Sequence, residues 1–443
     1  MEKININKGF KLKLAGIPDS SIKEMLSLQT VAVCAMDIPY IRPKLLVKEN
    51  ERVLTGAPVF CDKRDPSIQY VSPATGKVKE IRFGKRRRLQ AVVIECEPED
   101  EYIGFDQISS EQLPSIDKPQ LVSQLKTAGL WQSLRQFPSK DTANPDNEPS
   151  MIIVSVNGND IFSPDPGVLT NKYSDMIAYG IDVLKHFSHR IVVTVRESHL
   201  SRMGALQKII THTVPDMYPS WDPGVVLYHL KTRAEENTSW CIGIDHLIMI
   251  AQFLSTGRYP VEKMMTISKT DKNNPHVLTR QGASIKSLIN SVSSDDIMTS
   301  GQFNGRLLSQ NDFLGFFENT INIIPAADAE MMFGFVRPGF DVPTVSKTFF
   351  SSILPDKEVA LDATLHGEER ACINCSYCEN ICPNDLMPQF IMKALVTDEI
   401  EEALQLGMLD CSRCGLCAYT CPSKIELATI LSEGIDDYYL NAG

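Results

Sequence analysis

The chain has 443 residues, 43% of them hydrophobic, which is enough for several domains with separate cores. Its 44 basic and 55 acidic residues give a formal net charge of −11, which argues against nucleic acid as a partner. The N-terminal sequence has no apolar signal core, and the longest nearly apolar run, residues 246–254, is far shorter than the roughly 20 residues of a membrane-spanning helix. We therefore expect a soluble or peripheral protein.

Residues 41–95 alternate between short apolar and polar segments, a pattern that predicts β-strands. Glycine and proline mark the expected turns, at Gly56, Pro58, Pro73, Gly76 and Gly84. The layout resembles the barrel-sandwich hybrid fold of lipoyl and biotinyl carrier domains. The basic run at residues 85–88 is interpreted as a solvated hairpin tip; the alternative is a contact with anionic lipid headgroups or an acidic partner protein.

The resemblance to carrier domains raises the question of a modified lysine. In carriers a lysine at a hairpin is modified, and Lys63 falls near the equivalent place. Arg64 and Asp65 crowd it, and nothing else in the sequence indicates a swinging-arm enzyme. We therefore interpret Lys63 as an ordinary solvated turn residue.

Residues 109–138 carry helical signals, and a polar linker over residues 139–150 separates them from a buried strand over residues 151–158. The elements then alternate: helix 168–187, strand 190–195, helix 204–211, strand 224–229 and helix 245–256. This alternation predicts an α/β layer around a parallel sheet. The first strand is not followed by G-x-G-x-x-G, so the dinucleotide-binding fingerprint is absent.

Residues 261–310 predict a compact α+β unit of the β-grasp type, with a short helix after Gly282 and a return strand near Gly301 and Gly305. A further β region is expected over residues 321–354. Beyond it, residues 388–395 and 398–409 have the apolar periodicity of amphipathic helices. These helices lie between two cysteine runs, which is typical of the helical type of ferredoxin domain.

The cysteine runs at residues 372–383 and 411–422 each have the pattern C-x2-C-x2-C-x3-C-P. Two-cluster bacterial ferredoxins use this spacing for cubane iron–sulfur clusters, with the fourth cysteine of each run crossing to the other cluster. The predicted ligands of one [4Fe-4S] cluster are Cys372, Cys375, Cys378 and Cys421. Those of the second are Cys411, Cys414, Cys417 and Cys382.

Four other interpretations of these cysteines are weaker. Structural zinc sites need only C-x2-C pairs and remain the main alternative. A disulfide framework suits a short secreted chain, and a thioredoxin-like motif is a single C-x-x-C pair. Surplus core cysteines would not be periodic. The remaining cysteines stand in apolar surroundings and are expected in the core: Cys34, Cys61, Cys96 and Cys241.

The order of these units is similar to that of the C subunit of Rnf complexes, which couple electron transfer between NADH and ferredoxin to ion pumping. INKGFKLKLAGIP, the hairpin VSPATGKVKEIRFGKRRRLQAVVIE, GLWQSLRQFPSK, LTRQGASI and SGQFNGRL look more like the NqrA family of the Na+-translocating NADH:quinone reductases, along essentially the whole chain. The body resembles NqrA, and the cysteine-rich tail, which most NqrA sequences lack, resembles the Rnf protein.

The sequence and the resemblance together predict a multidomain α/β and α+β protein. The expected domains are a barrel-sandwich hybrid with an N-terminal extension (1–100), a Rossmann-like α/β domain with a degenerate flavin loop (101–258), a β-grasp domain of the SLBB type (259–312), a β connection (313–354) and a helical ferredoxin domain with two [4Fe-4S] clusters (355–443).

One departure from the Rnf family bears on cofactors. Rnf C subunits carry a G-x-G-G-x-G-F-P loop that cradles flavin and NADH. At that place Trp131, Gln132, Leu134 and Arg135 replace the glycines, although Phe137, Pro138 and Lys140 remain in register. We expect these side chains to fill the space where backbone approaches a phosphate, and therefore expect no FMN.

The resemblance implies a peripheral electron-transfer subunit of a Na+-translocating NADH:quinone oxidoreductase, bound to membrane subunits on the cytoplasmic face of the bacterial plasma membrane, with any quinone at a shared site. The alternatives are an Rnf-type subunit that still binds FMN and NADH, and a scaffold whose clusters only stabilise the tail. The eight histidines are dispersed and form no H-E-x-x-H metal-binding motif, and the sequence has no G-x-S-x-G nucleophile motif. We therefore expect no complete catalytic site in this chain.

Overall fold

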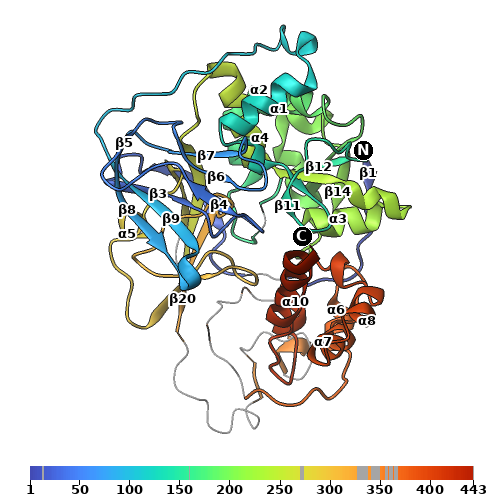
Figure 1. Cartoon of the computed structure of the whole chain (residues 1–443). Helices are drawn as coiled ribbons and strands as arrows, with labels where there is room; N and C mark the ends of the chain where they lie inside the picture. The colour runs from blue at the N-terminus through green and yellow to red at the C-terminus, as the bar shows by residue number, and fades with distance from the viewer. Residues whose placement is uncertain are drawn as a thin grey trace.

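The computed structural model describes residues 1–11, 14–158, 160–269, 274–326, 338–340, 350–354, 358, 363 and 368–442. Its described strands form sheets of seven, six, four and three strands, and the C-terminal segment is helical. In Figure 1 the N-terminal β-sheets lie on one side, the α/β layer lies beside them, and helices α6 to α10 lie below. The mixed α/β and multidomain architecture agrees with the prediction.

The N-terminal β domain consists of two small antiparallel sheets. One contains β3 (Thr30–Cys34), β9 (Leu89–Cys96), β8 (Gly76–Phe83) and β5 (Arg52–Val53); the other contains β4 (Pro43–Leu45), β6 (Pro58–Asp62) and β7 (Gln69–Val71). Phe60 and Tyr70 stack within a shared core at a centroid distance of 4.8 Å. The predicted turn residue Lys63 and the basic run are exposed, and residues 85–87 form the tip of the β8–β9 hairpin.

The seven-stranded sheet is parallel at its centre. Its order is β1 (Glu2–Lys3), β14 (His212–Val214), β13 (Ile191–Arg196), β12 (Ile152–Ser155), β15 (Trp240–Gly243), β10 (Arg135–Gln136) and β11 (Asp141–Thr142). The strands β14, β13, β12 and β15 pair in parallel. The parallel sheet agrees with the prediction, whereas part of the supposed linker 139–150 is an edge strand of it.

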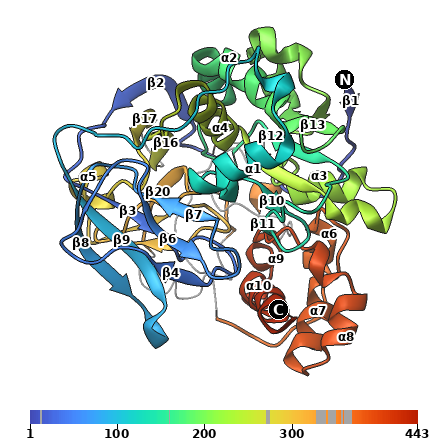
Figure 2. The same ribbon diagram turned by 45° about the horizontal axis from the view of Figure 1, so that its top comes forward.

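Helices cover both faces of this sheet, as the two views in Figures 1 and 2 show. Side chains of β12 alternate between two cores: Ile152 and Val154 face the core that contains α2 (Pro166–Leu184) and α4 (Ile244–Thr256). Ile153 faces the core that contains α3 (Pro223–Leu230). This period of two, with apolar residues on both faces, is what a covered parallel strand requires.

Two predicted elements of this layer are wrong. Residues 224–229 form helix α3 and not a strand, because Asp222 accepts a hydrogen bond from the Gly224 N–H at 2.7 Å and Pro223 occupies the first helical position. The strand that joins the sheet is β15 instead. Residues 204–208 form a 3-10 turn where a longer helix was expected.

The six-stranded sheet is assembled from distant parts of the chain. Its order is β19 (Leu307–Leu308), β18 (Asp296–Thr299), β20 (Thr320–Pro325), β16 (Glu262–Lys269), β17 (Asn274–Arg280) and β2 (Pro18–Glu24), with the short helix α5 (Ile285–Leu288) against its core. Strand β20 lies beyond the predicted unit 259–312, and β2 comes from the N-terminal extension. Of the β region expected after β20, residues 350–353 form a 3-10 turn, and most of the rest lies outside the described residues.

Gly282, which precedes α5, has φ +68°, and its carbonyl accepts a hydrogen bond from the Ala32 N–H at 2.8 Å. A Cβ there would overlap the carbonyl oxygen of Ala32. We expect Gly282→Ala to lower the free energy of unfolding by roughly 2–4 kcal/mol, from left-handed strain plus overlap. Urea unfolding measures this. The control is Gly204→Ala, because Gly204 has φ +52° and an added Cβ would meet no atom within 4 Å. It should lower the free energy of unfolding by only about 1 kcal/mol. Equal losses in the two variants would contradict the predicted steric overlap at Gly282.

The C-terminal segment is helical, as predicted. It contains α6 (Tyr377–Ile381), α7 (Pro388–Val396), α8 (Ile400–Gln405), α9 (Leu416–Tyr419) and α10 (Leu427–Ala442). Ile391, Ala403 and Leu431 belong to a core of its own. In the described part of the chain, no helix has the length and apolar character needed to span a membrane.

Candidate functional site

The first predicted cysteine set surrounds one hollow. Cys372, Cys375, Cys378 and Cys421 all line it, together with Gln389. Cys378 lies in α6 and is buried, Cys375 is exposed, and Cys421 follows α9. The structure therefore brings the fourth cysteine of the second run to the first three cysteines of the first run. We call these four residues the outer set.

The other four cysteines, Cys382, Cys411, Cys414 and Cys417, form the inner set. Burial, together with the neighbouring thiolate charges of Cys411 and Cys382, raises the pKa of the Cys414 thiol to about 12. Burial, followed by the charges of the other three cysteines, also raises the pKa of Cys417 well above its ordinary value. The Asn384 side-chain amide donates to the Asp410 carbonyl at 2.6 Å, which holds the end of the first run beside the start of the second and brings Cys382 to the second run.

The two cysteine runs share one backbone conformation. In the first run Asn374 and Ser376 have left-handed φ angles, and in the second run Arg413 and Gly415 have them at equivalent positions. Asp385 and Lys424, two residues after each run, also have them. Successive residues of this kind turn backbone N–H groups toward one side and form a concavity for negative groups. The Arg413 N–H donates to the Cys411 sulfur at 3.4 Å. Helices then begin at equivalent positions, α6 with α9 and α7 with α10.

Within the described ranges, no group of three or more histidine, cysteine, aspartate or glutamate side chains is placed to hold a single metal ion. A cubane cluster makes a different demand, since each of its four cysteines binds a separate iron. Four cysteines around a hollow, with N–H groups directed at a sulfur, fit that demand. If clusters are bound, the outer and inner sets are the residues that would hold them.

The inner set lies against the body of the protein. The Tyr218 hydroxyl donates to the Cys414 carbonyl at 2.8 Å, and the Lys231 ammonium pairs with Asp410 at 2.6 Å. Gly415 packs so closely on Phe303 that a Cβ would overlap its carbonyl oxygen. These contacts fix the second run on the α/β layer and on the loop between β18 and β19, while the outer set contains one exposed cysteine, Cys375.

A crevice of about 260 Å³ opens beside the inner set. It lies at the carboxyl ends of β12 and β15, where ligands bind in open α/β sheets. Ser155 and Gly243 line it from these strands, and Ser412 and Arg413 line it from the second cysteine run. The sequence does not predict this crevice, because its walls come from segments that are far apart in the chain.

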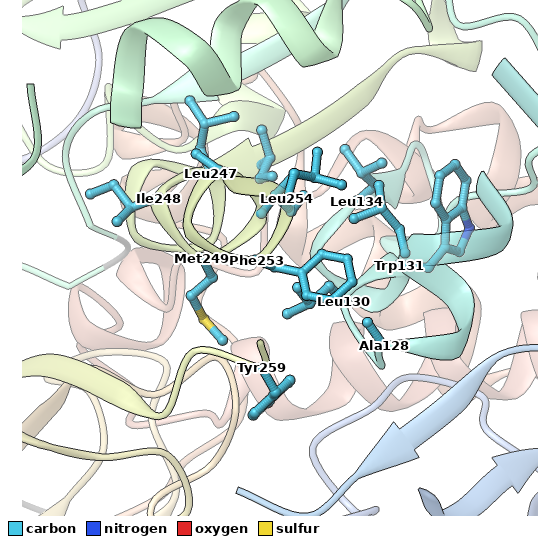
Figure 3. Close-up of a cluster of buried hydrophobic side chains, with 14 of the residues drawn as sticks. Ala128, Leu130, Trp131, Leu134, Leu247, Ile248, Met249, Phe253, Leu254 and Tyr259 are labelled. Atoms are coloured by element: carbon cyan, nitrogen blue, oxygen red, sulfur yellow. The ribbon is translucent and has the colours of Figure 1, made fainter. Parts of the chain in front are cut away.

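The segment 129–140 also borders the crevice, but not as predicted. Trp131 and Leu134 are fully buried in the hydrophobic core, and Figure 3 shows them with Leu130 beside the α4 residues Phe253 and Leu254. The Trp131 indole N–H donates to the Ala143 carbonyl at 2.8 Å. Neither side chain lines the crevice, so both belong to the core beside it, and the expected absence of FMN stays a prediction.

Gln132 is buried as well and donates to the Gly129 carbonyl at 2.9 Å. The expectation placed Gln132 and Arg135 at glycines of the Rnf loop, but with Phe137 and Pro138 in register those glycines fall at Trp131, Ser133, Leu134 and Gln136. Ser133 is the one of these four that lines the crevice, beside Arg135 and Lys140. The sequence signal was present in the apolar spacing of Leu130 and Leu134, which indicates a buried face. The apolar spacing gives no signal for Ser133 and Arg135, although both lie in the segment that corresponds to the Rnf loop.

The remaining cysteines are free thiols, as expected. Cys34, Cys61 and Cys241 are buried, and Cys96 is half-buried. Cys241 also lines the crevice, a position that its apolar surroundings in the sequence did not indicate.

Three segments of the chain match known protein families. Residues 4–97 match the NqrA N-terminal barrel-sandwich hybrid domain, and residues 116–259 match the NqrA second alpha/beta domain. Residues 371–425 match a 4Fe-4S dicluster domain, which supports iron–sulfur binding by this segment. The predicted barrel-sandwich domain is thereby confirmed.

Among solved structures, chains of NAD+-reducing [NiFe]-hydrogenase align at TM-scores of 0.32 and 0.39, with 10% and 11% identity. The alignments cover 51% and 76% of this chain, which spans only 52% and 64% of those chains. Similarity this low establishes no shared fold.

Curated relatives match along nearly the whole chain. The NqrA protein of the Na(+)-translocating NADH-quinone reductase from Rhodopirellula baltica is 28% identical over 97% of this chain and 96% of its own length. Its counterpart from Cellvibrio japonicus is 27% identical over 98% of both chains. These relatives are subunits of an oxidoreductase. From its N-terminal β domain to its cysteine-rich tail, the chain is thus similar to the NqrA proteins of the Na+-translocating NADH-quinone reductases.

Proposed function

We propose that this chain is the peripheral electron-transfer subunit of a Na+-translocating NADH:quinone oxidoreductase, with two [4Fe-4S] clusters in its C-terminal domain. Similarity to NqrA relatives over nearly the full length supports the assignment to this reductase complex. The match to a 4Fe-4S dicluster domain supports the binding of iron–sulfur clusters. The observation that carries the proposal is the crossing of cysteines: Cys421 lies with the first run around one hollow, and Cys382 lies with the second.

In this proposal the outer set ligates one cluster and the inner set the other. When bound, the clusters would take up and release single electrons. The thiolates hold the irons, and N–H groups such as that of Arg413 stabilise the negative charge on sulfur. The outer set, which contains the exposed Cys375, offers a route to a partner protein, while the inner set contacts the body of the protein through Cys414.

The domain assignments follow the same proposal. Residues 101–258 form a Rossmann-like domain, residues 259–312 a β-grasp domain of the SLBB type that also recruits β2 and β20, residues 313–354 a connection, and residues 355–443 a helical ferredoxin domain. The parallel order β14-β13-β12-β15 and the sheet around β16 support the first two assignments.

The partners would be membrane subunits of the complex, on the cytoplasmic face of the bacterial plasma membrane, with any quinone at a site shared with them. This chain would supply no complete catalytic site of its own. The second candidate is an Rnf-type subunit that binds FMN and NADH, and the specific observation in its favour is the crevice beside the inner set.

Anaerobic purification with iron, sulfide and flavin assays tests the proposal. We expect about eight irons and about eight sulfides per chain, no flavin, and an EPR signal on reduction. Stoichiometric FMN would favour the Rnf-type alternative. Zinc in place of iron would contradict the cluster assignment, and clusters that cannot be reduced would favour a purely structural role.

A further inference from the structure

Arg135 carries a positive charge that has no counterion in the described structure. Its Nε donates to the Lys140 carbonyl at 2.7 Å, and its guanidinium lies over the Phe317 ring at 4.7 Å from the centroid. It forms no ion pair with any described carboxylate. Burial lowers the pKa of its guanidinium, and a guanidinium shielded from water without a partner costs free energy. Its terminal N–H groups are available to a ligand in the crevice.

Ser133 supplies a second polar group without a partner. Its side chain is 1% exposed and lines the crevice, and its hydroxyl has no hydrogen-bond partner in the described structure. Buried hydroxyls are nearly always hydrogen-bonded, so an unpaired hydroxyl in a residue that borders the crevice indicates a ligand or a water next to it. Ser133 and Arg135 are two residues apart in the chain and line the same cavity.

The acidic groups of the crevice are already engaged. Asp222 caps α3 through the Gly224 N–H at 2.7 Å and lies 3.4 Å from the Lys140 ammonium. Asp245 lies 3.1 Å from the His246 ring nitrogen. Arg413, which also lines the crevice, pairs with Asp436 at 2.7 Å. Arg135 is therefore the lining cation that has no acidic partner among the described residues, and its charge favours an anion in the crevice.

The size of the crevice limits the class of anion. At about 260 Å³ it is smaller than the roughly 300–1,000 Å³ of pockets that enclose drug-sized ligands. The volume lies just below that range, which favours an anion smaller than a whole flavin nucleotide. A phosphate or diphosphate group, with oxygens for both guanidinium N–H groups and for the Ser133 hydroxyl, fits it.

We propose that this crevice binds a small phosphate-bearing anion through Arg135 and Ser133, next to the loop of the inner cysteine set. Lys140 helps to shape the site, since its ammonium is fixed by the Ser412 carbonyl at 3.0 Å and by Asp222. The proposal does not depend on what the cysteine sets hold, because none of the eight cysteines contributes a proposed contact.

Calorimetric titration of the full-length, anaerobically purified chain with pyrophosphate, in phosphate-free buffer, tests this site. We expect one saturable site per chain. Arg135→Gln should weaken binding about 10- to 100-fold, the effect of losing a charge-assisted hydrogen-bonding group. Ser133→Ala, which removes one neutral hydrogen bond, should weaken it about 2- to 10-fold. Urea unfolding verifies that each variant is folded.

Arg86→Gln is the matched control, because Arg86 is an exposed arginine at the β8–β9 tip, far along the chain from the crevice. It should leave binding unchanged. The site is disproved if folded wild-type protein binds no pyrophosphate, or if the Arg135 and Arg86 variants bind equally. FMN that binds more than about tenfold tighter than pyrophosphate would overturn the small-anion assignment in favour of a flavin. If Arg135→Gln does not fold, the site is tested by Ser133→Ala, and unchanged pyrophosphate binding by that variant would disprove it.

Discussion

Replacing Cys417 with serine should lower the iron content of the purified chain from about eight to about four per molecule. Cys417 belongs to the inner set, so the cluster held by the outer set should survive. Cys378→Ser should also halve the iron, but by removing the outer cluster. Serine is close in size to cysteine and lacks the thiolate that binds iron, so the change acts on the ligand more than on packing. Iron and sulfide assays with EPR of the reduced protein measure both effects.

The proposed crossing of the fourth cysteine of each run is tested by two further variants. If Cys421 serves the outer cluster, Cys421→Ser should reproduce the EPR spectrum of Cys378→Ser and not that of Cys417→Ser. Cys382→Ser should in turn resemble Cys417→Ser. The opposite pairing would show that each run holds its own cluster and would refute the assignment that the hollow supports. Cys96→Ser, a half-buried cysteine outside both sets, should keep all the iron.

The eight cysteines could be predicted because their signal is local. The spacing C-x2-C-x2-C-x3-C-P specifies which residues face a cluster without reference to the rest of the fold. The left-handed turns at Ser376 and Gly415 arise within the same short segments. The spacing does not reveal where the domain docks. The contact of Tyr218 with Cys414 joins residues almost two hundred positions apart, and no periodicity reports such a pairing.

Helix α3 shows a different kind of error. The run GVVLYH is rich in β-branched and aromatic residues, which favours a strand by local propensity alone. The preceding Asp222-Pro223-Gly224 repeats the Asp165-Pro166-Gly167 sequence that starts α2, and in both helices the aspartate caps the glycine N–H. Capping decided the structure, since Asp-Pro favours the start of a helix even when the next residues have strand propensity.

The edge strands could not be predicted for a topological reason. Strand β1 pairs with β14 and strand β2 pairs with β17, so the N-terminal extension completes two sheets formed much later in the chain. Short polar strands such as Glu2–Lys3 carry no amphipathic signal. Their conformation depends on an exposed sheet edge provided by other segments.

Trp131→Ala should lower the free energy of unfolding by about 3–5 kcal/mol, the range for large-to-small changes of buried aromatic residues. The indole ring is fully buried and meets Trp240 and Phe187 edge-on, at 5.9 and 5.6 Å between centroids. Truncation would leave a cavity and also an unpaired carbonyl at Ala143, whose hydrogen bond from the indole is 2.8 Å long. Urea unfolding measures the loss.

The same variant distinguishes two roles of the segment 129–140. If Trp131 belongs to the core, the folded variant should bind pyrophosphate within about threefold of wild type and should still bind no FMN, because its side chain does not line the crevice. If Trp131 instead blocked a flavin cradle, its removal would allow FMN to bind, so flavin binding by the folded variant separates the two roles. Phe83→Ala, a truncation of an aromatic side chain that is 46% exposed, is the control and should change stability by no more than about 0.5 kcal/mol. A large loss of stability without any gain of flavin binding would therefore mean that a packed core stands where the Rnf loop has its glycines, and that the remaining crevice depends on Ser133 and Arg135.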